Sequence, residues 1–187
     1  MTRTIELVPH DPAWLQQAQA EATRVTALLA SNVLAVHHIG STAIPGIKAK
    51  PILDLLVEVR DLERVDELNE QMIAGGYEPR GENGIPGRRY FVWRTGNTHT
   101  HHLHVFQRGH AEIERHLLFR DYLLAHPAQA QAYSRLKEQL AVTFREDPEG
   151  YTDGKSDFIR EVDVQARGIA AGGGYPPCSA SNSSKRG

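Results

Sequence analysis

The chain has 187 residues, of which 40% are hydrophobic and 24% are charged, so it is long enough to bury a core and is predicted to form one domain. Lysine and arginine (21) nearly balance aspartate and glutamate (23), and this balance argues against a protein that holds nucleic acid by its overall charge. The single cysteine excludes an internal disulfide framework, and no apolar run reaches the length of a membrane span, so we expect a cytoplasmic protein that does not bind a membrane.

The first third of the chain alternates helix and strand. A helix is predicted over residues 12–30, because Asp11 followed by proline is typical of a helix start and helical apolar spacing follows. The β-branched run over 33–40 is predicted to be a strand that opens into a loop, and residues 51–59 are predicted to form the next strand. A second helix is expected over 61–76, where an aspartate cap precedes the helical pattern and two glycines end it.

The middle of the chain is predicted to be β-structure. Strands are expected over residues 77–81, 88–94 and 99–107, and the sequence Thr-Gly-Asn-Thr at 95–98 is typical of a hairpin between the last two. These strands follow the earlier ones without an internal repeat.

The last third is predicted to be helical. Helical patterns cover residues 111–125, 128–146 and 152–170, with a break between the first two at His126-Pro127. Residues 171–187 are rich in glycine, proline and serine and are predicted to be a disordered tail. Strands in the middle with helices on both sides predict an α+β domain over residues 1–170 with a helical C-terminal third.

Asp54 is the unusual residue of the strand over 51–59. Successive side chains of a strand point to opposite faces, so Asp54 should point away from the main core, and its whole face should look into a cleft or solvent. A strand aspartate that is hydrogen-bonded to a nearby loop would explain the residue equally well. The apolar face consists of Leu53, Leu55, Val57 and Val59, and the other face holds Ile52, Asp54, Leu56 and Glu58.

The loop before this strand has the composition of an anion-binding loop. Gly40, Ser41 and Thr42 follow a strand directly, so they can present backbone N–H groups and two hydroxyls to an anion, and Lys48 and Lys50 add positive charge. Glycine, serine and proline are also common in ordinary loops, so the loop alone does not decide between the two interpretations.

The spacing of the Gly-Ser loop and the aspartate resembles the signature of the nucleotidyltransferase superfamily. More specifically, HIGSTAIPGIKAKPILDLLVEV resembles the central motif of the GrpB family, and RRYFVWR, HLHVF, FRDYLLAHPAQAQAYSRLK and YTDGKSDFI resemble its later blocks in the same order. The resemblance covers roughly residues 5–170. It implies a nucleotidyltransferase-like mixed β-sheet flanked by helices, in which the Gly-Ser loop (Gly40, Ser41, Thr42) holds phosphates and Asp54 holds a divalent metal, Mg²⁺ or Mn²⁺.

The chain departs from the superfamily pattern at the second acidic position, where it has Leu56. Glu58 is not expected to replace that acid, because residues four apart on a strand lie about 13 Å apart. Where the superfamily has a third acid, this chain has HTHHLHVF.

His102 and His104 are expected to share one strand face, so Asp54, His102, His104 and His38 form a candidate mixed metal site. One carboxylate with two or three imidazoles would suit Zn²⁺, Mn²⁺, Fe²⁺ or Ni²⁺ better than Mg²⁺. The alternative is that these histidines are hydrogen-bonded and line a polar groove.

Three cationic residues are candidates for phosphate binding in addition to Lys50. Arg88 and Arg89 begin a predicted strand, and Lys155 follows Asp153-Gly154 near a helix start, at a position where the family resemblance adds weight. A solvated surface position would also explain each of them.

These observations favour a protein that binds a nucleotide or a phosphorylated small molecule and transfers a nucleotidyl group to an acceptor. A non-catalytic binding module on the same scaffold is the alternative, and the missing second carboxylate favours it. A metal-dependent enzyme built on the histidines is a third hypothesis.

Overall fold

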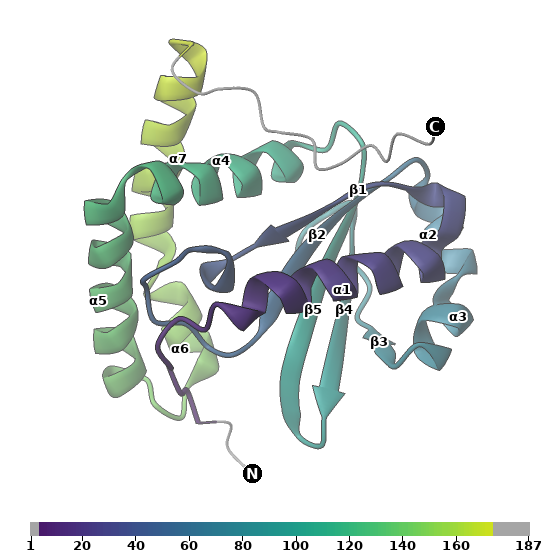
Figure 1. Ribbon diagram of the computed structural model, residues 1–187, viewed down its shortest axis with the longest axis horizontal. Helices are drawn as coiled ribbons and strands as arrows, with labels where there is room; N and C mark the ends of the chain where they lie inside the picture. The colour runs from purple at the N-terminus through teal and green to yellow at the C-terminus, as the bar shows by residue number, and fades with distance from the viewer. Residues whose placement is uncertain (1–3, 174–187) are drawn as a thin grey trace.

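A computed structural model describes residues 4–173 of the chain. A five-stranded sheet forms its centre, and helices cover both faces (Figure 1). The prediction of an α+β fold, with a mixed sheet flanked by helices and a helical C-terminal third, is confirmed. The strands are β1 (Val33–Ile39), β2 (Leu53–Val59), β3 (Tyr77–Pro79), β4 (Arg88–Thr95) and β5 (Thr98–Gln107), and the α-helices are α1 (Ala13–Leu29), α2 (Leu62–Glu67), α3 (Asn69–Ala74), α4 (Ala111–Ala125), α5 (Pro127–Thr143), α6 (Pro148–Asp153) and α7 (Ser156–Ala171).

The sheet has the strand order β1-β2-β5-β4-β3. The β2–β5 pair is parallel and every other pair is antiparallel. In the parallel pair Asp54 lies beside His102, and Leu56 lies beside His104. Because neighbouring residues in register point to the same face, the sheet places Asp54 and both histidines on one side.

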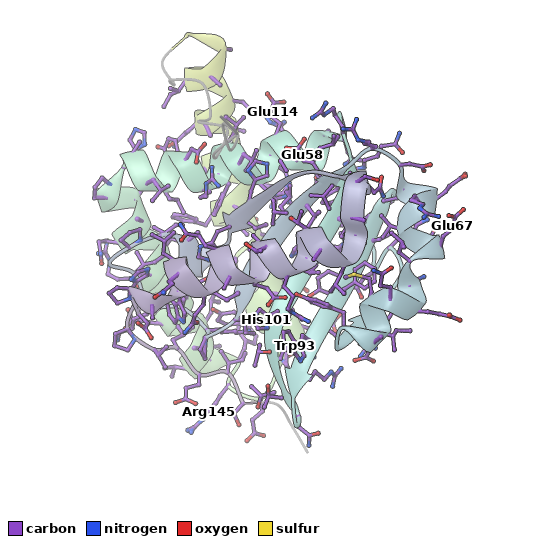
Figure 2. All side chains as sticks on the ribbon, turned by 45° about the vertical axis from the view of Figure 1, so that its right-hand side comes forward. Glu58, Glu67, Trp93, His101, Glu114 and Arg145 are labelled. Carbon is purple, nitrogen blue, oxygen red and sulfur yellow. The ribbon has the colours of Figure 1, made fainter. Side chains whose placement is uncertain are left out.

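The other face of the sheet carries the main core, and α1 runs across it (Figure 1). The four apolar residues predicted for this face of β2 are all buried in that core. They pack against Trp14, Val25 and Leu29 of α1 and against Met72 of α3. His101 also lies on this face, where its ring stacks on Trp93 at 4.9 Å (Figure 2).

The Asp54 face divides into an apolar part and a polar part. Leu56 is fully buried together with Phe106 and with Ile113 and Leu117 of α4. The expectation that this whole face of β2 looks into a cleft or solvent is therefore wrong for Leu56, because α4 crosses the sheet there. Helix α4 does not extend over Asp54, so a cavity can form beside this carboxylate.

The C-terminal helices form a second core beside the sheet. Tyr133 of α5 and Phe158 of α7 stack at 5.1 Å. Ile44 and Ile47, from the loop between β1 and β2, are buried in the same cluster. The Gly-Ser loop is thus anchored on the helices by its own apolar residues, and α5 and α6 are brought next to Asp54.

Several predicted boundaries change in the structure. The helix expected over 61–76 is two short helices, α2 and α3, that meet at Leu68, and the helix expected over 152–170 begins at Ser156 after the separate α6. The predicted tail over 171–187 lies outside the described residues from 174 onward. Among residues 4–173, no helix is both long and apolar enough to cross a membrane.

Candidate functional site

A cavity of about 890 Å³ opens where the Asp54 end of the sheet faces α5 and α6. Residues from the Gly-Ser loop, β2, the β4–β5 hairpin and the two helices line it. Four cationic side chains and two carboxylates take part, namely Lys50, Arg94, Lys137, Lys155, Glu6 and Asp54. The cavity therefore has an excess of positive charge, which suits an anionic ligand.

Gly40 and Asp54 fit against each other. Gly40 has φ +71°, a conformation that glycine adopts without strain, and a Cβ added there would lie 2.5 Å from Oδ2 of Asp54. The carboxylate thus occupies the space that a side chain at position 40 would fill. This contact joins the Gly-Ser loop to the strand and places Ser41 on the wall of the same cavity as Asp54.

Asp54 is hydrogen-bonded to His102, which is itself paired with His99. Its Oδ1 lies 2.9 Å from Nδ1 of His102, and Nε2 of His102 lies 3.1 Å from Nδ1 of His99. Burial alone would raise the pKa of Asp54, but the hydrogen bond with His102 and the nearby His104 outweigh it and hold the pKa far below its usual value. The ionised carboxylate can only accept, so His102 carries its proton on Nδ1 and can accept one at Nε2.

His104 is held in a different way. Its Nε2 is 3.8 Å from Oδ1 of Asp54, and its Nδ1 is 3.3 Å from Nη1 of Arg88. Burial lowers the pKa of His104, so the ring is neutral at physiological pH. His104 does not line the cavity.

Three lysines gather on the opposite wall, two of them over the ring of Tyr151 and Lys137 over the ring of Tyr133. The Nζ atoms of Lys50 and Lys155 lie 4.0 Å and 4.7 Å from the ring centre of Tyr151. Lys137, which is 2% exposed, donates to the backbone oxygen of Lys48. Burial, reinforced by the charge of Lys155, lowers the pKa of Lys137 to about 7, and burial also lowers the pKa of Lys155 despite the attraction of Asp54. A bound anion would offset the cost of burying these two ammonium groups close together.

The two hydroxyls of the Gly-Ser loop have separate environments. Ser41 lines the cavity and hydrogen-bonds Tyr133, whose pKa burial raises. Thr42 is 2% exposed, its Oγ1 donates to the backbone oxygen of Ile52 at 3.3 Å, and it accepts from Nε2 of His38 at 2.9 Å. Ser41 is therefore placed to meet a ligand, whereas the Thr42 hydroxyl is used to close the loop.

The structure does not bring His38 or Arg89 to the cavity. His38 pairs with Leu55 in the sheet and so points to the α1 face, where burial lowers its pKa to about 4. Arg89 also lies on that face and forms a bidentate ion pair with Asp66, at 2.6 Å and 2.7 Å. The predicted residues that do line the cavity are Ser41, Thr42, Lys50, Asp54, His102 and Lys155.

The side chains do not make up a protein-held metal centre. Within the described part of the chain, no group of three or more histidine, cysteine, aspartate or glutamate side chains is arranged to hold a metal ion. The position of the second superfamily acid is the buried Leu56, and Oδ1 of Asp54 is engaged with His102. A metal that joined the site would need most of its ligands from a bound phosphate and water.

Four further residues line the cavity that were not predicted from the sequence, namely Arg94, Asn97, Lys137 and Tyr151. Tyr151 and Lys155 are four residues apart, a spacing that could have indicated a ring beneath an ammonium group. Lys137 carries no comparable signal, because a lysine inside an amphipathic helix is normally exposed.

Comparison with known proteins agrees with this architecture. A family model described as GrpB protein matches residues 4–165. The chain belongs to the GrpB family. A crystal structure of the conserved protein GrpB from Enterococcus faecalis superposes with a TM-score of 0.84 and 40% identity, over 89% of this chain and 99% of that one.

Two further relatives of this GrpB-family protein are longer than this chain. UPF0157 protein YqkA of Bacillus subtilis is 46% identical over 88% of this chain but only 48% of its own length. A protein of Mycolicibacterium paratuberculosis named dephospho-CoA kinase is 30% identical over 92% of this chain and 48% of its own length. The chain thus spans about half the length of these two relatives.

Proposed function

We propose that the cavity of this GrpB-family protein binds the phosphates of a nucleotide or a phosphorylated small molecule and presents a phosphorus atom to Asp54 and His102. One observation carries the proposal: Lys50, Lys137 and Lys155 face a hydrogen-bonded Asp–His pair across a single cavity. Lysines act as compact charges toward phosphate oxygens, and Ser41 adds a hydroxyl.

The two walls of the cavity have separate roles in a transfer reaction. The lysines neutralise and hold the leaving phosphate. Asp54 keeps the proton of His102 on Nδ1, so Nε2 of His102 accepts from Nδ1 of His99, and the two paired imidazoles can take the proton of an attacking hydroxyl. Nucleotidyl transfer to a small acceptor is the reaction that suits this arrangement. The name of the mycobacterial relative, dephospho-CoA kinase, is that of a phosphate-transferring enzyme and agrees with a phosphate-bearing ligand.

A non-catalytic binding module is the second candidate, and Leu56 favours it. The residue removes the carboxylate that a two-metal mechanism needs. Binding in both cases would rest on the same lysines, so only turnover separates the two functions.

The test combines calorimetric titration with a pyrophosphate assay on the full chain. ATP, GTP, CTP and UTP are titrated in EDTA and in Mg²⁺, Mn²⁺ or Zn²⁺. Pyrophosphate release is followed for each nucleotide that binds, with ribose 5-phosphate, glycerate or glycerol supplied as the acceptor. We expect Lys155→Ala to weaken binding about tenfold, because it removes a partly buried phosphate contact. Lys48→Ala is the matched control, since its ammonium pairs with Glu138 at the surface at 2.6 Å.

Equal losses of nucleotide affinity in Lys155→Ala and Lys48→Ala would show that the cavity is not the phosphate site. Binding accompanied by pyrophosphate release supports the enzyme, and binding without release under every metal condition supports the module.

A further inference from the structure

A second, smaller cavity of about 350 Å³ adjoins the first. Arg94, His99 and His102 line both, so the two imidazoles stand at their common boundary. Arg80 and Tyr90 are among the residues that complete the smaller cavity.

The two cavities lie on opposite sides of the Asp–His pair. Tyr90 and Val92 of β4 stand beside His104 and His102 of β5, so the smaller cavity lies over β4. The lysines approach from the other direction, from the loop before β2 and from α5 and α6. The order across the sheet is therefore lysines, Asp54, the imidazoles and the smaller cavity.

This order matches the geometry of an in-line displacement, in which the attacking and leaving oxygens lie on opposite sides of the phosphorus. A leaving phosphate held by the lysines requires the attacking group to arrive from the β4 side. The smaller cavity is the space on that side.

The chemistry of the smaller cavity indicates an anion. Arg80 and Arg94 are both held by one carboxylate, that of Glu78, at 2.7 Å and 3.2 Å. Two guanidinium groups that share one acid retain a net positive charge, and their planar donors suit a carboxylate or phosphate.

From these observations we infer that the smaller cavity is a second binding site, which takes a small hydroxyl-bearing anion as the acceptor of the transferred group. The inference rests on the proposed function of the larger cavity. In the reaction the acceptor oxygen bonds to the α-phosphorus of a nucleoside triphosphate, and the bond from that phosphorus to the leaving oxygen breaks with its electron pair going to pyrophosphate. The proton of the acceptor hydroxyl passes to the hydrogen-bonded imidazole pair of His99 and His102 at the boundary.

The test is a pair of titrations in which each cavity is altered separately. The full chain is titrated with α,β-methylene-ATP and, in its presence and absence, with ribose 5-phosphate and glycerate as anionic alcohols and with ribose and glycerol as neutral controls. Arg80→Gln alters the smaller cavity and Lys155→Gln the larger. We expect Arg80→Gln to weaken an anionic alcohol at least about fivefold and the nucleotide analogue by less than about twofold, and Lys155→Gln to do the reverse.

The inference fails if neither anionic alcohol binds the wild type with a dissociation constant below about 10 mM, or if the alcohol competes with the nucleotide analogue. It also fails if affinity for the alcohol depends on Lys155 rather than Arg80. If the analogue does not bind but the alcohol still binds through Arg80, the proposed function of the larger cavity is wrong and the smaller site stands.

Discussion

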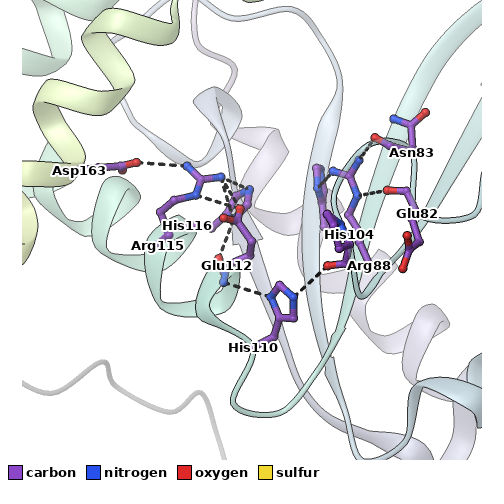
Figure 3. Close-up of polar contacts among 10 residues, drawn as sticks. Glu82, Asn83, Arg88, His104, His110, Glu112, Arg115, His116 and Asp163 are labelled. Carbon is purple, nitrogen blue, oxygen red and sulfur yellow. Dashed lines mark hydrogen bonds and ion pairs between the residues drawn. The ribbon is translucent and has the colours of Figure 1, made fainter.

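Two polar clusters lie on the same face of the sheet, and their charge balance differs. Around Arg88 and α4, two arginines are matched by two acids, since Arg115 pairs with Glu112 at 2.7 Å and contacts Asp163 at 3.5 Å (Figure 3). Arg88 donates to backbone oxygens of the loop before β4. Around Asp54, by contrast, the cavity-lining lysines outnumber the acids.

The difference separates structural from functional use of buried charge. A cluster whose opposite charges balance can stabilise the fold without a ligand. A cluster with excess charge of one sign is expected to bind a ligand of the opposite sign. Both clusters contain histidines and arginines, so residue types alone do not distinguish them.

Removal of Arg88 should have the largest effect on stability. Its side chain is buried, and its Nε and Nη2 bond the backbone oxygens of Glu82 and Asn83 at 3.0 Å and 2.6 Å. We expect Arg88→Ala to lower the free energy of unfolding by about 3 kcal/mol, because buried acceptors lose their donor. Urea denaturation measures the change, with the exposed Arg64→Ala as control. A loss no larger than that of the control would contradict a structural role for this cluster.

A side chain at Gly40 should destabilise the fold through Asp54. Gly40→Ala combines a left-handed backbone with a Cβ placed 2.5 Å from the Asp54 carboxylate, so we expect a loss of about 1–3 kcal/mol. Asp54→Gly in the same chain should recover part of that loss, since it removes the clashing atoms. Strictly additive effects in denaturation of the single and double variants would show that the two residues do not meet.

Nucleotide affinity should depend on pH through Lys137. The pKa of Lys137 is lowered to about 7, so the free protein loses this charge as pH rises above that value, whereas bound phosphate favours the charged form. We expect the dissociation constant for ATP to rise about five- to tenfold between pH 6.5 and 8.5. Calorimetry at the two pH values measures it, and Lys137→Met should remove most of the dependence. A variant that keeps the full pH dependence would place the titration on another group.

The smallest expected change is in the position of the proton on the His102 ring. Because ionised Asp54 accepts from Nδ1 of His102, nitrogen NMR should find the Nδ1–H tautomer in the wild type. Asp54→Ala should shift His102 toward Nε2–H with little loss of stability. His126 is an internal control, since its Nδ1 donates to the backbone oxygen of Tyr122 at 2.8 Å, a contact that does not involve Asp54. An unchanged His102 tautomer would show that Asp54 does not orient the ring.

The sequence predicted the face on which Asp54 lies, because alternation along one strand is a local property. It did not predict which residues of other strands share that face. His38 and Arg89 each lie one position away from a residue on the Asp54 face, and register between strands depends on tertiary packing. Leu56 is buried because α4 crosses the sheet, and Lys137 reaches the cavity because α5 packs on the loop, so neither could be derived from local pattern.

The parallel pairing of β2 with β5 also has a kinetic consequence. Asp54 and His102 are 48 residues apart in sequence, and β3, β4 and two helices lie between them. Contacts across such a separation form after the local hairpin and helices, since closing the long loop costs chain entropy first. We therefore expect the Asp54–His102 hydrogen bond to be among the last contacts made during refolding, so that a chain with an assembled site has already completed its sheet.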